Sequence, residues 1–179
     1  DKDTSRGLGD VYKRQDVLAA LDTGGTIAAL LKAMNFPSWM LASMIFLVGA
    51  CLSLATGSSW GTFALIIPIV VPLAIALEIS VPICLGAALS GGLFGDQTSP
   101  ISDTTVLSSM SSGVSHMAHV ETQFPYALIT AGFTFFGFIL ASLVEGFGPM
   151  YLSVASMLGL LGLFYWYLSR YQLVKAVNI

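Results

Sequence analysis

A run of carboxylate and hydroxyl side chains near the middle of the chain has the chemistry of a small-cation site. Residues 95–105 read GDQTSPISDTT. The candidate ligands are the carboxylates of Asp96 and Asp103 and the hydroxyls of Thr98, Ser99, Ser102, Thr104 and Thr105. Oxygen atoms suit hard cations, and the carboxyl end of a preceding helix adds partial negative charge. We therefore expect Na⁺ to bind at Asp96 and Asp103.

Both aspartates also have simpler interpretations. Asp103 could act only as the N-cap of a following helix, accepting hydrogen bonds from the amides of Thr105 or Val106. Asp96 could be an interfacial turn residue. A carboxylate at the centre of a membrane span costs about 2.5–3.5 kcal/mol, and this segment carries two, so we favour the ion-binding role.

A second polar segment, ATGSSWGT at residues 55–62, separates two apolar blocks. Its candidate substrate or ion contacts are Thr56, Gly57, Ser58, Ser59 and Thr62. In transporters with discontinuous helices, such a hairpin tip and a broken helix bind the ion together near the bilayer midplane. A turn that merely reverses the chain is the alternative.

The same segment contains the pattern G-x-S-x-G, with Ser59 as the nucleophile of a hypothetical intramembrane serine hydrolase. A nucleophile elbow needs a strand before the serine, whereas apolar helices are predicted on both sides. The hydrolase is therefore a remote alternative, and we expect a protein that is not an enzyme.

His116 and His119 lie in the polar segment SSGVSHMAHVETQ. Because imidazole titrates near neutral pH, they are candidates for pH sensing, with a solvated loop as the alternative. Only Glu121 is near enough to help these histidines bind a metal, so no resident metal or other cofactor is expected. Na⁺ and H⁺ are expected as transported ions. Cys51 and Cys84 lie in apolar stretches, which predicts buried side chains.

The composition places these segments in a membrane protein. The 179 residues are 55% hydrophobic and 9% charged, with a mean hydropathy of +0.82, against about 25% charged residues in soluble domains. The lipid bilayer is the expected partner. A net charge of −3 without a basic run gives no sign of nucleic-acid binding.

The apolar blocks predict an all-α, polytopic architecture. We expect a re-entrant helical hairpin at 39–77 (or two full spans), a discontinuous transmembrane helix at 81–110 broken in its middle at Pro100, a loop at 111–123, and spans at 124–145 and 147–168. Residues 17–34 form a weaker apolar stretch. The small residues of 81–95 predict close packing against protein.

The first fifteen residues, DKDTSRGLGDVYKRQ, differ sharply in composition from the rest. They resemble translated sequencing-adaptor read-through, and we expect 1–15 to be a non-native leader. Residues 16–179 would then be part of a larger membrane domain.

Three stretches carry a resemblance to a known family. ATGSSWGTFALIIPIVVPLA, LGAALSGGLFGDQTSPISDTTVLSSM and SHMAHVETQFPYAL resemble the NhaC-type sodium/proton antiporters of the ion transporter superfamily, over residues 16–167. The resemblance implies two inverted repeats, of which this chain is the carboxyl-terminal one, so that a missing amino-terminal repeat would be its partner. It further implies a multi-pass protein of a bacterial inner (cell) membrane; a homodimer stays open.

The resemblance also implies the function, with some departures. Family members often have His-Cys where this chain has Gln97-Thr98, and an acidic pair where Ser115 and Ala118 stand. The expected activity is exchange of Na⁺ for H⁺, the two ions competing for the aspartates. A cation-coupled organic acid or amine exchanger of the same fold is the alternative.

Overall fold

The computed structural model describes residues 23–145, 155, 158–159, 161–167 and 169–170. Its elements are α2 (Thr23–Ala33), the 3-10 helix η1 (Ser38–Met40), α3 (Leu41–Thr56), α4 (Ser59–Ala76), α5 (Val81–Thr98), α6 (Asp103–Ser111) and α7 (His116–Glu145). The described residues contain no strand. Three stretches, Ser38–Thr56, Ser59–Ala76 and His116–Val144, are long and apolar enough to cross a membrane. The prediction of an all-α membrane protein is confirmed.

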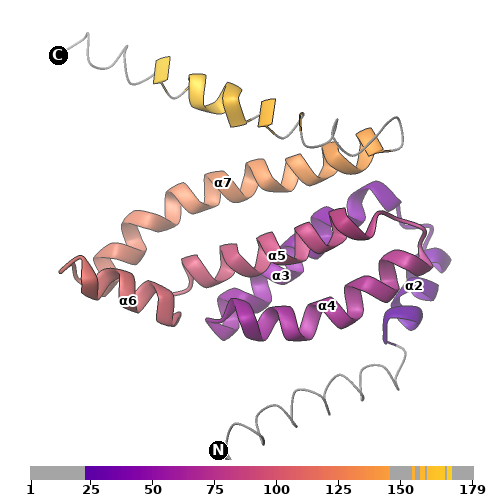
Figure 1. The fold of residues 1–179 in the computed structure, drawn as a ribbon, viewed down its shortest axis with the longest axis horizontal. Helices are drawn as coiled ribbons and strands as arrows, with labels where there is room; N and C mark the ends of the chain where they lie inside the picture. Colours follow the sequence, from indigo (N-terminus) through magenta and orange to yellow (C-terminus); the bar gives the residue numbers. More distant parts are fainter. Residues whose placement is uncertain (1–22, 146–154, 156–157, 160, 168, 171–179) are drawn as a thin grey trace, which may run out of the picture.

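The helices lie alongside one another in a bundle (Figure 1). The chain runs along α3, reverses into α4, reverses again into α5, continues through α6 and returns along α7. α2 packs on α4, where Gly24 lies against Pro72. Because the chain reverses between α3 and α4 and again between α4 and α5, the α3–α4 turn and the α5–α6 junction lie at the same end of the bundle.

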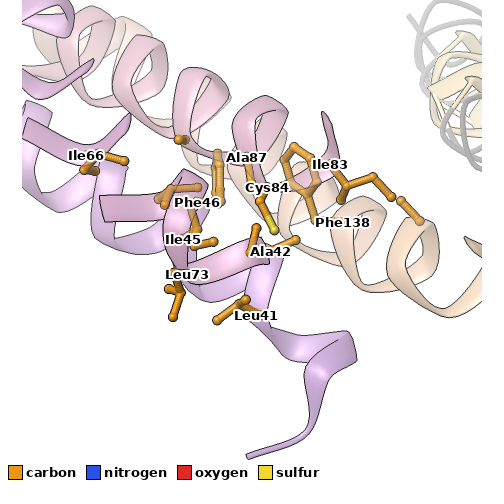
Figure 2. Packing of buried hydrophobic residues seen from close by; sticks show 14 of the residues in the cluster. Leu41, Ala42, Ile45, Phe46, Ile66, Leu73, Ile83, Cys84, Ala87 and Phe138 are labelled. Atoms are coloured by element: carbon orange, nitrogen blue, oxygen red, sulfur yellow. The ribbon is translucent and has the colours of Figure 1, made fainter. Parts of the chain in front are cut away.

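Small and aromatic side chains form the core. Figure 2 shows Ala42 and Phe46 of α3, Cys84 of α5 and Phe138 of α7 packed together. Cys84 is buried as predicted, whereas Cys51 is exposed. The buried prediction was wrong for Cys51 because apolar neighbours in a membrane helix do not tell which of its faces meets another helix.

Glycines of α5 bring it into backbone contact with α3. A Cβ on Gly91 would overlap the carbonyl oxygen of Phe46, and a Cβ on Gly95 would overlap that of Ala50. The hydroxyl of Ser53 in α3 donates to the carbonyl oxygen of Gly92 at 2.6 Å. The expectation that this element packs closely against protein is confirmed.

Two predicted boundaries need correction. The loop expected at 111–123 is shorter, because α7 begins at His116. Polar side chains in the first turns of α7 bond to backbone carbonyls of the same helix: the Thr122 hydroxyl donates to the carbonyl oxygen of Ala118 at 2.8 Å. The interruption at Pro100 does not lie in the middle of 81–110. It follows 18 residues of α5 and precedes 9 residues of α6.

Other predicted segments are only partly visible. The arms of the hairpin are α3 and α4, and α4 keeps its helix through Pro68 and Pro72; re-entrant and spanning interpretations both stay open. Residues 1–15 lie outside the described residues, as does much of the predicted span at 147–168, of which Phe164 packs on Phe133 with ring centroids 4.2 Å apart.

Candidate functional site

Two interruptions of the helical backbone meet at one end of the bundle. The first is the tip between α3 and α4, where Gly57 ends α3 in the left-handed conformation at φ 66° and Ser58 caps α4. The Ser58 hydroxyl accepts the amide of Gly61 at 3.3 Å. The second is the segment 99–102 between α5 and α6. Proline cannot donate a helical hydrogen bond and disfavours helix in the residue before it, so the break falls at Pro100.

The two interruptions touch each other directly. The Ser99 hydroxyl donates to the carbonyl oxygen of Leu54, in the last turn of α3, at 2.8 Å. Gly57 lies against Ile101, since a Cβ on Gly57 would stand 2.9 Å from the Ile101 Cγ1 atom and 3.0 Å from its carbonyl oxygen. The tip is therefore packed against the break, and a side chain at Gly57 has no room.

Asp96 sits where the two interruptions meet. It is 5% exposed. One carboxylate oxygen, Oδ2, accepts from the hydroxyl of Ser59 at 3.0 Å, and the other, Oδ1, accepts from the hydroxyl of Ser102. A buried charge is costly unless it is hydrogen-bonded, and here the donors come from the tip on one side and the break on the other. Asp96 is therefore a buried residue in the last turn of α5 and not a turn residue; its depth in the membrane stays a prediction.

The remaining predicted ligands of the break mostly bind backbone carbonyls. The Thr98 hydroxyl donates to the carbonyl oxygen of Phe94 at 2.7 Å. That of Thr105 donates to the carbonyl oxygens of Asp96 and Gln97 at 3.4 and 3.2 Å. The bonds of Thr105 reach carbonyl oxygens in the last turn of α5, which a helix end leaves without intrahelical amide partners. Thr104 extends the carboxylate network, because its hydroxyl lies 2.7 Å from that of Ser102.

At the tip, Thr62 and Thr56 shape the turn. Thr62 is fully buried and its hydroxyl donates to the carbonyl oxygen of Ser58 at 2.9 Å. The hydroxyl of Thr56 lies 3.4 Å from that of Thr62. Of the five tip residues predicted as contacts, Ser59 alone reaches the carboxylate of Asp96 among the described hydrogen bonds.

Asp103 is placed differently from Asp96. It is exposed on the described chain and is the first residue of α6, with Oδ1 accepting the amide of Thr104 at 2.9 Å. The N-cap is Ser102, so the interpretation of Asp103 as an N-cap bonded to Thr105 or Val106 was wrong in residue and in partner. Its negative charge still stabilises α6, because the N-terminus of a helix carries partial positive charge.

The two histidines also differ. The Nε2 atom of His116 lies 2.7 Å from the carbonyl oxygen of Pro100, and Nδ1 lies 3.2 Å from the hydroxyl of Ser109. His116 thus contacts the break instead of lying in a solvated loop. The sequence held no signal for this contact, which depends on how α7 returns along the bundle. A pH-sensing role for His116 or His119 stays a prediction.

The geometry gives no support to a serine hydrolase. Helices lie on both sides of Ser59, and its hydroxyl donates to Asp96. His116 is engaged with Pro100 and Ser109 instead. Within the described part of the chain, no group of three or more His, Cys, Asp or Glu residues is placed to hold a metal. The arrangement around Asp96 offers carboxylate and hydroxyl oxygens, which suit a proton or an alkali cation.

Comparison with known proteins agrees with this chemistry. Residues 15–143 match the profile described as the Na⁺/H⁺ antiporter family. The chain is 37% identical to a malate-2H⁺/Na⁺-lactate antiporter of Bacillus subtilis over 75% of its length and 31% of the relative's. An uncharacterized protein of Haemophilus influenzae is 39% identical over 69% of this chain and 24% of its own length. An uncharacterized Na⁺/H⁺ antiporter of the same organism is 35% identical over 61% of this chain and 25% of its own length.

The chain therefore spans about a quarter to a third of the length of these curated relatives. No solved structure matches it.

The contact between tip and break can be tested with two matched glycines. Gly57 and Gly113 both have φ 66°, but Gly113 has nothing within 4 Å of an added Cβ. Alanine at either position carries a left-handed strain of about 1–2 kcal/mol, and at Gly57 it must also displace Ile101. We expect Gly57→Ala to lower the melting temperature of the full-length protein in detergent clearly more than Gly113→Ala. Equal shifts would contradict the packing of the tip against the break.

Proposed function

This chain belongs to the Na⁺/H⁺ antiporter family, and we propose that the protein containing it exchanges Na⁺ for H⁺ through a site centred on Asp96. The observation that supports the site most strongly is the buried carboxylate with hydroxyl donors from two separate backbone interruptions. An ionisable residue inside a membrane protein favours a functional role, and discontinuous-helix transporters bind their ions beside interruptions of this kind.

Exchange follows from competition for one carboxylate. In the proton-loaded state Asp96 carries the hydrogen that is to be transported. In the sodium-loaded state the same carboxylate binds Na⁺, and the hydroxyls of Ser59 and Ser102 turn their oxygen atoms towards the ion, because a hydroxyl can accept as well as donate. If the site opens to one side of the membrane at a time, the two ligands bind alternately and their movements are coupled.

Asp103 has a subsidiary role in this proposal. Its exposed carboxylate at the start of α6 adds negative charge near the break, which attracts a cation without enclosing it. Ser99, Thr98 and Thr105 hold the backbone of the site through their bonds to carbonyl oxygens. We further propose that the rest of the protein supplies a second repeat that completes the site, and that the assembly sits in a bacterial cell membrane.

The central prediction is that Asp96→Asn abolishes exchange. Asparagine keeps the shape and can still bond to Ser59 and Ser102, but it cannot exchange a proton for Na⁺. In everted vesicles from an antiporter-deficient host, we expect the full-length Asp96→Asn protein to lose Na⁺-induced dissipation of the pH gradient. Asp103→Asn should reduce apparent Na⁺ affinity and keep measurable exchange. Exchange at wild-type level in Asp96→Asn, at matched expression, would contradict the proposal.

The two hydroxyls should affect sodium affinity. Losing one hydrogen bond to a charged group costs about 1.5–3 kcal/mol, so Ser59→Ala and Ser102→Ala should each raise the KM for Na⁺ by about tenfold or more. Ser111→Ala is the matched control, since its exposed hydroxyl donates only to the carbonyl oxygen of Ser108 in its own helix. A KM unchanged in both Ser59→Ala and Ser102→Ala would remove these serines from the site.

A second candidate function is cation-coupled exchange of an organic acid or amine. It is favoured by the 37% identity to the protein named a malate-2H⁺/Na⁺-lactate antiporter. If the chain serves such a carrier, malate on one face of proteoliposomes and lactate on the other should stimulate Na⁺ flux several-fold. Flux that is indifferent to malate, lactate and simple amines would leave ion exchange as the supported function.

A further inference from the structure

The interruption at 99–102 is held from two sides. On the hairpin side, Ser99 binds the carbonyl oxygen of Leu54 and Ile101 lies against Gly57. On the other side, the carbonyl oxygen of Pro100 receives Nε2 of His116, the first residue of α7. A break in a helix leaves carbonyl oxygens without helical donors, and other groups satisfy them. His116 supplies a donor of this kind.

We propose that His116 is a positioning residue of the ion site, which holds the break in the shape that directs Ser102 to Asp96. The inference rests on the proposed function of Asp96. Pro100, which His116 binds, is two residues before Ser102, whose hydroxyl reaches Asp96 Oδ1. His116 itself has no described contact with Asp96, so its influence on the ion passes through the backbone of the break.

The hydrogen bonds of His116 define its ring orientation. A carbonyl oxygen can only accept, so Nε2 carries a hydrogen. The Nδ1 atom lies 3.2 Å from the hydroxyl of Ser109, which is 1% exposed and which also donates to the carbonyl oxygen of Val106 at 2.8 Å. The ring is thus held at both nitrogens, one by the break and one by α6. The bond to Pro100 joins the break to the first residue of α7, so that it closes the segment 100–116, which contains α6.

Loss of this bond should weaken ion binding more than it slows transport. Without the Nε2 donor, the Pro100 carbonyl must find another partner, and the residues that follow it are free to turn. Ser102 would then spend less time near Asp96. Because the carboxylate that exchanges ions is untouched, the KM for Na⁺ should rise while the maximal rate changes little.

The test compares four variants of the full-length protein in everted vesicles at matched expression. His116→Ala removes both bonds, and we expect it to raise the KM for Na⁺ about fivefold. His116→Gln places an amide nitrogen near the position of Nε2 and should restore the KM to within about twofold of wild type, whereas His116→Asn reaches only as far as Nδ1 and should resemble alanine. His119→Ala is the control, because His119 has no described hydrogen bond to the break.

The outcomes separate this inference from the function on which it rests. If Asp96→Asn abolishes exchange but His116→Ala leaves the KM unchanged, or if glutamine is no better than asparagine, the positioning role is overturned and the ion site stands. If exchange persists in Asp96→Asn, the site itself is wrong. Should His116→Ala fail to accumulate, the comparison of His116→Gln with His116→Asn decides, since only the former keeps a donor for Pro100.

Discussion

The two hydrogen bonds to the Asp96 carboxylate depend on helices that stop in the right places. Ser59 can reach Oδ2 because α3 ends at Gly57 and the chain turns there, and Ser102 can reach Oδ1 because α5 ends before Pro100. Because Asp96 is buried, water cannot readily replace these donors. The site is thus built from places where the helix is broken, and the surrounding contacts keep those breaks from closing or drifting apart.

Close packing of α3 against α5 makes this meeting of breaks possible. Gly91 and Gly95 allow the backbone of α5 to approach Phe46 and Ala50 of α3. Gly95 directly precedes Asp96, so one of the two close approaches of these helices lies next to the carboxylate. The small residues of α5 therefore support the arrangement around Asp96, because the close approach of α5 to α3 sets the distance across which Ser99 reaches the carbonyl oxygen of Leu54.

Much of this arrangement could be predicted from local chemistry. Apolar length predicts the helices, the Gly-Ser pair at 57–58 predicts the turn, and Pro100 predicts the break. The difference between Asp96 and Asp103 could not be predicted, because both stand in the same polar run and only the tertiary structure buries one and exposes the other. The contact of His116 with Pro100 was also beyond reach, since it joins residues 16 positions apart across α6. Polar residues at 116–123 suggested a loop, yet they form the first turns of α7.

The most direct test of the account is equilibrium binding of Na⁺ to the purified full-length protein at a series of pH values, measured by isothermal titration calorimetry. If Na⁺ and one proton compete for Asp96, sodium affinity should decrease as the pH is lowered. In the pH range where the proton occupies the carboxylate, the decrease should be about tenfold for each pH unit. The Asp96→Asn protein should show no such binding. Sodium affinity that is independent of pH, or that survives unchanged in Asp96→Asn, would contradict the account.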